Sequence, residues 1–196
     1  MIIGITGGVG CGKSTVLNYF KDKYKAYIIE ADKVAYDLSL PGNPGYDSIL
    51  RFFPEVKLMD NGFIDRKHLA SIVFNDESKL KLLNSIIHPL VKEKITELII
   101  ENRENRYIII EAALLIEDGY DNICDEIWYI YCDLETRIER LNKSRNYSRE
   151  KSLEIINNQM SEEDYKKHTD YIIDNSFDQE STHNKIDELL SKRQFD

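Results

Sequence analysis

The chain has 196 residues, of which 42% are hydrophobic, and its formal net charge is −9. This length is enough for one buried core with one or two small lobes. The acidic balance argues against a general nucleic-acid binder, because such a protein needs a basic face for the phosphates.

Five short apolar runs are typical of buried strands, with helical patterns between them. They lie at residues 2–6, 27–29, 107–111, 127–131 and 171–173. Their apolar residues are continuous rather than alternating, which indicates parallel strands covered on both faces. We therefore expect an α/β fold built on a doubly wound sheet of five parallel strands.

The first strand leads into a glycine-rich loop that matches the phosphate-binding pattern GxxxxGK[ST]. Its residues are Gly7, Gly8, Val9, Gly10, Cys11, Gly12, Lys13 and Ser14. Glycines let backbone N–H groups approach phosphate oxygens, and the helix that follows offers its positive end. Lys13 would neutralise the β- and γ-phosphates, and the Ser14 hydroxyl could bind Mg²⁺. We expect residues 8–15, from Gly8 to Thr15, to bind ATP, with the Lys13 side chain exposed and Cys11 present only as a small residue.

The second strand ends at Glu30-Ala31-Asp32. In an open parallel sheet, ligands bind beyond the carboxyl ends of the strands. A carboxylate at this position can accept the hydroxyl proton of a phosphoryl acceptor. An equally favoured alternative makes Asp32 the N-cap of a helix over residues 33–38, and both roles can coexist.

Residues 33–105 are mostly helical in pattern and too long for a simple crossover between two strands. Turn-forming clusters at residues 41–45 and 60–62 divide the stretch, which predicts an inserted helical lobe. Within it, Pro89 after His88 is expected to open a helix. On pattern alone, a histidine there is more often structural than functional.

The third strand ends at Glu111, which could hold magnesium through water or could be a solvated strand terminus. Further on, residues 137–151 carry six basic side chains in an acidic chain. Arg137 and Arg140 are three residues apart and share a helical face. Beside a phosphate-binding loop, this basic segment favours a lid over residues 135–169 that closes on ATP, rather than a merely solvated helix.

The sequence Asn184-Lys185-Ile186-Asp187 matches NKxD, a guanine-reading pattern of GTPases. That pattern should follow a buried strand, whereas here a polar stretch precedes it. The chain also has no DxxG sequence. We therefore predict that residues 184–187 are helix surface, and that the protein is a small-molecule kinase.

From residue 2 to about residue 190, these fragments resemble the dephospho-CoA kinase family. The resemblance depends on their order more than on any single fragment after the loop. The matching fragments are Gly4 to Gly8 with the loop, Glu30 to Ala35, Ile64-Asp65-Arg66, Leu69, Val73-Phe74, Ile87 to Leu90, Ala113 to Glu117, Arg140, Gln159, and Asp170 through Asp174-Asn175.

The resemblance implies a P-loop NTPase fold with an adenylate-kinase-like core over residues 1–32, 106–134 and 170–196. It also implies an acceptor-binding lobe at 33–105 and the lid at 135–169. The implied reaction moves the γ-phosphoryl group of ATP, with Mg²⁺, to the ribose 3′-hydroxyl of dephospho-CoA, giving CoA and ADP.

The resemblance also implies roles for individual residues. Asp32 takes the place of the catalytic carboxylate, and Arg140 lies near ATP and joins Lys13 in catalysis. Arg66, Phe74 and His88 belong to the acceptor region. Two positions depart from the family, because Ala113 replaces a common proline and Ser144 occupies the place of a second lid arginine, next to Arg145. Another nucleoside or nucleotide kinase of the same fold is the alternative.

The three cysteines, Cys11, Cys124 and Cys132, form no CxxC pair. Neither a disulfide framework nor a zinc knuckle is expected, which favours a reducing compartment. The sequence has no pattern of a signal peptide and no apolar run long enough to span a bilayer. We therefore expect a cytoplasmic monomer or weak homo-oligomer without membrane or nucleic-acid partners.

Overall fold

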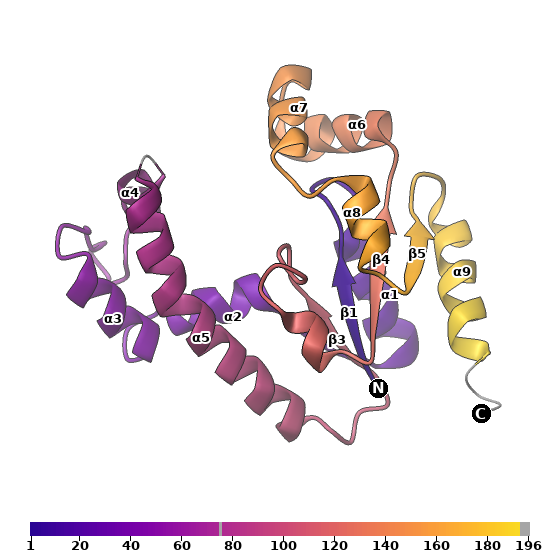
Figure 1. Ribbon diagram of the computed structural model, residues 1–196, viewed down its shortest axis with the longest axis horizontal. Helices are drawn as coiled ribbons and strands as arrows, with labels where there is room; N and C mark the ends of the chain where they lie inside the picture. The colour runs from indigo at the N-terminus through magenta and orange to yellow at the C-terminus, as the bar shows by residue number, and fades with distance from the viewer. Residues whose placement is uncertain (75, 193–196) are drawn as a thin grey trace. The chain divides into compact units, whose positions relative to one another are not determined.

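The structure is a computed structural model that describes residues 1–74 and 76–192. The chain divides into two compact units. One, the core unit, comprises Met1–Ile28 together with the chain from Glu104 onward, and the other, the helical unit, is Ile29–Arg103. Figure 1 shows the course of the chain through both.

The sheet has five strands in the order β2-β3-β1-β4-β5. The strands are β1 (Ile2–Thr6), β2 (Tyr27–Glu30), β3 (Ile108–Glu111), β4 (Glu126–Tyr131) and β5 (Tyr171–Asp174). The central strand β1 pairs in parallel with β3 and β4, and β4 pairs in parallel with β5. This confirms the predicted α/β fold, with strand ends that differ from the prediction by at most one residue.

The helices of the core unit follow the strands in chain order. They are α1 (Lys13–Tyr24), the 3₁₀ helix η1 (Tyr120–Ile123), α6 (Leu134–Arg145), α7 (Arg149–Asn157), α8 (Glu162–Lys167) and α9 (Gln179–Ser191). Ile3, Ile5 and Ile130 of the sheet are fully buried and pack with Val16 and Phe20 of α1. The inner strands β1, β3 and β4 are buried along almost their whole length, which explains why their sequences are mostly apolar. The edge strands β2 and β5 are buried only in part.

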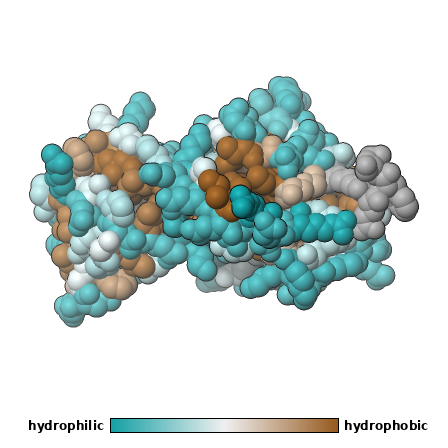
Figure 2. Space-filling model, turned by 90° about the horizontal axis from the view of Figure 1, so that it is seen from below, coloured by the Kyte–Doolittle hydropathy of each residue, from teal (hydrophilic) through white to brown (hydrophobic). Residues whose placement is uncertain are grey.

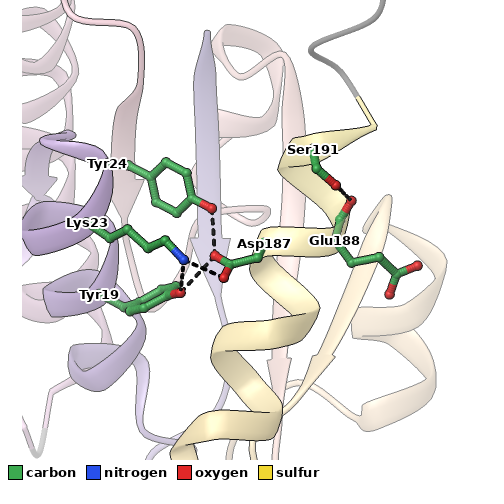
Figure 3. Close-up of polar contacts among 6 residues, drawn as sticks. All are labelled: Tyr19, Lys23, Tyr24, Asp187, Glu188 and Ser191. Atoms are coloured by element: carbon green, nitrogen blue, oxygen red, sulfur yellow. Dashed lines mark hydrogen bonds and ion pairs between the residues drawn. The ribbon is translucent and has the colours of Figure 1, made fainter.

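A polar cluster between α1 and α9 ties the first helix to the last (Figure 3). The Asp187 carboxylate accepts hydrogen bonds from Tyr19 at 2.8 Å, Tyr24 at 2.6 Å and Lys23 at 2.5 Å. The NKxD-like residues 184–187 therefore lie on a helix, as predicted. Asn184 and Lys185 are exposed, as predicted, but the description as helix surface was wrong for Ile186, which is fully buried, and Asp187 is only 31% exposed.

The helical unit contains α2 (Ala31–Leu38), α3 (Pro44–Phe52), α4 (Arg66–Val73) and α5 (Glu77–Glu101). Helices α2, α3 and α4 all pack against α5, and the unit buries a cluster of its own that includes Ile49, Phe53 and Ile64. The prediction that Pro89 opens a helix was wrong, because Pro89 lies inside the 25-residue α5, which begins after the N-cap Asp76. The packing of α5 against three other helices offsets the hydrogen bond that the proline removes.

Within residues 1–74 and 76–192, no helix is both long enough and apolar enough to cross a membrane. On the face drawn in Figure 2, hydrophilic side chains predominate and apolar side chains gather in separate patches.

Candidate active site

The phosphate-binding loop connects β1 to α1, in the strand–loop–helix order that the motif requires. Gly7 has a φ of 148°, and a Cβ atom there would lie 2.6 Å from the carbonyl oxygen of Ile130. Gly12, the N-cap of α1, has a φ of 82°, in the left-handed region that favours glycine. The backbone itself thus requires these two motif glycines.

The first turn of α1 carries no acidic residue, and its N-cap Gly12 makes no side-chain capping bond. The positive end of the helix dipole is therefore not neutralised by the helix's own side chains. Ser14 in this turn is exposed, and Thr15 is half-buried. This arrangement suits an anion such as a phosphate.

Lys13 is held in place by two groups of the core unit. Its Nζ atom donates to the Gly7 carbonyl oxygen at 2.8 Å and lies 3.4 Å from Oε1 of Glu111 at the end of β3. The two side chains are 17% and 14% exposed, so the expectation of an exposed Lys13 was wrong. The structure therefore brings together the lysine of the loop and the acid predicted to hold magnesium.

Three cations influence the electrostatics of the loop around Cys11, which is only 1% exposed. Burial raises the pKa of the Cys11 thiol, and the charges of Arg137, Lys13 and Arg140 oppose that rise. The thiol stays protonated at neutral pH, consistent with its predicted role as a small residue. The same interactions place the three positive charges close to the loop.

Arg140 projects from α6 and is half-buried. Its Nη1 atom donates to the Cys132 sulfur at 3.4 Å and would lie 3.3 Å from a Cβ atom built on Gly12. The sequence-predicted Arg140 therefore lies beside the last glycine of the loop.

Asp32 belongs to the helical unit and is the second residue of α2. The alternative that Asp32 caps this helix was wrong, since the N-cap is Glu30 and α2 has no side-chain capping bond. The helix begins two residues earlier than predicted, which puts Asp32 within its first turn. There the Asp32 side chain is exposed, and a carboxylate is favoured by the helix dipole.

The predicted acceptor residues are spread over the helical unit. Arg66 is the first residue of α4, and its guanidinium carbon lies 5.1 Å from the ring centre of Tyr36. Phe74 follows α4 and is 83% exposed, whereas His88 lies within α5.

Arg66 lines a cavity of about 400 Å³ within the helical unit. The cavity also borders Tyr36, Leu40, Met59, Phe63 and Lys67. Asp65 also lines the cavity, and its carboxylate already accepts from the backbone N–H groups of Lys67 and His68. An apolar wall beside two cations suits a ligand that is partly apolar and partly anionic. Phe74 and His88 are not part of the cavity lining, so only one of the three predicted acceptor residues lies there.

Three residues hold the loop in ways that sequence reasoning did not assign. Asn175 donates to the carbonyl oxygen of Cys11 at 2.7 Å, and Arg137 and Gln159 both bond to Val9. The only sequence signals were the family-like fragments that contain Gln159 and Asn175 and the basic segment that contains Arg137. None of these sequence features predicts that the side chain contacts the phosphate-binding loop.

The chain is similar to proteins of one family over almost its full length. The sequence pattern of a family described as dephospho-CoA kinase matches residues 1–180. A dephospho-CoA kinase of Carboxydothermus hydrogenoformans is 39% identical over 97% of this chain and 93% of its own length. One from Prochlorococcus marinus is 36% identical over 96% and 94%. A solved dephospho-CoA kinase structure from Campylobacter jejuni covers 97% of this chain and 96% of its own, with a TM-score of 0.73 and 26% identity.

Proposed function

The chain belongs to the dephospho-CoA kinase family, and from this premise we propose that it transfers the γ-phosphoryl group of ATP to the ribose 3′-hydroxyl of dephospho-CoA. The products are CoA and ADP. The observation that carries the proposal is the phosphate-binding loop, with Lys13 and Arg140 beside it, in a chain that its relatives match over almost its full length.

In the proposed reaction, Lys13 and Arg140 neutralise the charge that develops on the transferring phosphoryl group. Asp32 accepts the proton of the 3′-hydroxyl as the new O–P bond forms and the bond to ADP breaks. Its exposed position at the start of α2 leaves the carboxylate open to a substrate. A base of this kind typically contributes ~10²- to 10⁴-fold to a rate.

Mg²⁺ fits the oxygen donors that the chain offers. Ser14 is exposed beside Lys13, and the Glu111 carboxylate lies at the end of the neighbouring strand. No group of three or more histidine, cysteine or acidic side chains forms a metal cage in the part of the chain that the structure describes. Sparse protein ligation suits Mg²⁺, which keeps several waters and binds substrate phosphates, and whose charge would offset that of the polyphosphate.

The acceptor is proposed to use the helical unit, with the cavity beside Arg66 contributing to its binding. Its two cations suit the pyrophosphate of dephospho-CoA, and its apolar wall suits the rest of the molecule. Phe74 and His88 remain predicted acceptor contacts. A cytoplasmic location and a monomeric or weakly associated state also remain predictions.

A coupled assay of ADP release tests the function. With Mg-ATP, we expect turnover with dephospho-CoA and only background rates with AMP, with adenosine or without acceptor. A preference for AMP or adenosine would favour another kinase of the same fold, and acceptor-independent hydrolysis with a preference for GTP would favour a GTPase. The 3′-deoxy analogue of dephospho-CoA should not be phosphorylated, and its phosphorylation would contradict the proposed position.

A further inference from the structure

Two side chains from distant parts of the core unit hold the peptide groups on either side of Val9, in the middle of the phosphate-binding loop. The Val9 N–H donates to Oε1 of Gln159 at 2.9 Å. The Val9 carbonyl oxygen accepts from Nε of Arg137 at 2.9 Å. The two side chains also bond to each other, because Nη2 of Arg137 donates to the same Gln159 oxygen at 2.8 Å. The three groups form a closed set of hydrogen bonds.

These three hydrogen bonds require both a carboxamide at position 159 and a guanidinium at position 137. Two donors converge on Gln159, so its carboxamide oxygen must face them. Arg137 uses two nitrogens of its planar guanidinium at once, one for Val9 and one for Gln159. A lysine has the same charge but lacks this fixed pair of donors.

The loop fits closely against the pair. A Cβ atom on the buried Gly8 would lie 2.3 Å from Nη2 of Arg137 and 3.0 Å from Oε1 of Gln159. A Cβ atom on Gly10 would lie 3.0 Å from the carbonyl oxygen of Arg137. Two loop glycines thus permit the approach of these side chains and of α6, apart from any need to approach a phosphate.

The pair leaves the other donors of the loop available to a ligand. Protein acceptors take up the N–H groups of Val9, Cys11 and Thr15. In the described part of the chain, the N–H groups of Gly10, Gly12, Lys13 and Ser14 have no protein acceptor. Arg137 and Gln159 therefore fix the backbone from which these four donors extend.

The two residues lie 22 residues apart in the segment predicted to be the lid, residues 135–169. Arg137 lies in the first turn of α6, and Gln159 lies in the connection between α7 and α8. We propose that Arg137 and Gln159 are a positioning pair, which holds the loop in its phosphate-binding conformation and couples the order of the loop to that of segment 135–169. This proposal rests only on the nucleotide-binding half of the proposed function.

Four variants test the pair. Gln159→Met keeps size but removes the acceptor, Arg137→Lys keeps charge but removes the paired donors, and Arg137→Met removes both charge and donors. The double variant combines Gln159→Met with Arg137→Lys. Binding of ATP and ADP is measured by calorimetry, with KM and kcat from the ADP-release assay. We expect each single change to weaken ATP binding ~10-fold or more, with an unchanged KM for the acceptor. The double variant should bind ATP almost as tightly as the single variant that binds it less tightly, because both changes break the same hydrogen-bond network.

Asn158→Ala is the matched control, since Asn158 is an exposed carboxamide residue next to Gln159. It should bind ATP as the wild type does. Thermal unfolding shows whether the variants fold. If Arg137→Lys were unfolded, Gln159→Met alone would carry the binding test.

Three results would overturn the proposal: unchanged ATP binding by a folded Gln159→Met protein, fully additive effects in the double variant, or near-normal binding by Arg137→Lys while Arg137→Met is impaired. The last result would mean that Arg137 acts as a charge on the nucleotide. Calorimetry of ATP binding needs no acceptor, so the two proposals can fail separately. A wild-type protein that binds ATP but does not phosphorylate dephospho-CoA would contradict the proposed function. The variants' ATP affinities would still test the positioning pair.

Discussion

Nζ of Lys13 lies 3.4 Å from Oε1 of Glu111, so the loop lysine forms an ion pair with the acid at the end of the neighbouring strand. Ile5, just before the loop, is the register partner of Glu111, so the β1–β3 pairing sets this contact. The geometry gives Lys13 a defined position near the site where phosphates would bind. It also gives Glu111 a cation partner that a bound polyphosphate would have to share.

Lys13→Ala should remove most turnover and leave the protein folded. The loss of one preorganised charge at a transferring phosphoryl group typically costs ~10²- to 10³-fold in kcat. The hydrogen bond to Gly7 contributes only about 1 kcal/mol to stability. The ADP-release assay measures the loss of kcat, and thermal unfolding measures the change in stability. A folded variant with near-normal kcat would show that the loop does not bind phosphate as proposed.

Glu111→Gln should raise the Mg²⁺ concentration needed for half-maximal activity. The amide keeps the size of the side chain but removes the negative charge that would hold a magnesium-bound water. Loss of such an outer ligand typically weakens metal affinity ~10- to 100-fold. Titrating Mg²⁺ at saturating ATP measures this change. An unchanged Mg²⁺ dependence would leave Glu111 only as the partner of Lys13.

Arg140→Ala should weaken ATP binding ~10- to 100-fold, as expected for a lost hydrogen bond to a charged group. Binding of dephospho-CoA should change little, because Arg140 lies beside Gly12 of the loop. Arg106→Ala is the control, since Arg106 is an exposed arginine of the same unit. Calorimetric titration of both ligands decides the matter, and a selective loss of acceptor binding would assign Arg140 to the acceptor site.

Asp187→Asn should lower stability by about 1–3 kcal/mol, because it removes the charge that accepts three hydrogen bonds between α1 and α9. Burial alone would raise the pKa of Asp187, but the bonds from Lys23, Tyr24 and Tyr19 outweigh burial and hold that pKa below its ordinary value. A lowered folded-state pKa stabilises the fold above about pH 4. This stabilisation is lost as the pH falls further, through the pKa of the folded state.

Urea unfolding of wild type and Asp187→Asn at neutral and acid pH measures this linkage. The difference in unfolding free energy should be largest near neutral pH and should shrink below about pH 4. Glu180→Gln, at an exposed position in the first turn of the same helix, should show a much smaller difference, because only the helix dipole favours its charge. A gap between wild type and Asp187→Asn that stays constant over the whole pH range would contradict the role of the carboxylate charge.

Sequence patterns predicted the elements whose position depends on residues that are close together in the chain. The strand β1 was predicted correctly to the residue, because a central parallel strand is covered on both faces and its isoleucines form a short apolar run before the glycine-rich loop. Pro89 was misplaced, because tertiary packing keeps α5 continuous through it. The bond from Val9 to Gln159 spans 150 residues of sequence, and no periodicity encodes such a contact.

Asp32→Asn should nearly abolish phosphoryl transfer while both substrates still bind. The acceptor hydroxyl must lose its proton as the O–P bond forms, and an amide of the same size cannot take that proton. The expected loss is ~10²- to 10⁴-fold in kcat, or roughly 3–5 kcal/mol of barrier. Stability should fall by at most about 1 kcal/mol, because Asp32 is exposed and lies within the first turn of α2, after the N-cap.

Asp37→Asn is the matched control for this change, since Asp37 is an exposed aspartate on the same helix α2. It should leave kcat at the wild-type value, so a loss confined to Asp32→Asn cannot come from altered helix charge. Calorimetry with ATP and dephospho-CoA separates a catalytic defect from a binding defect. A folded Asp32→Asn protein with wild-type kcat would exclude Asp32 as the base and leave Glu111 as the next candidate. A variant that loses dephospho-CoA binding but keeps kcat at saturation would instead make Asp32 a binding residue.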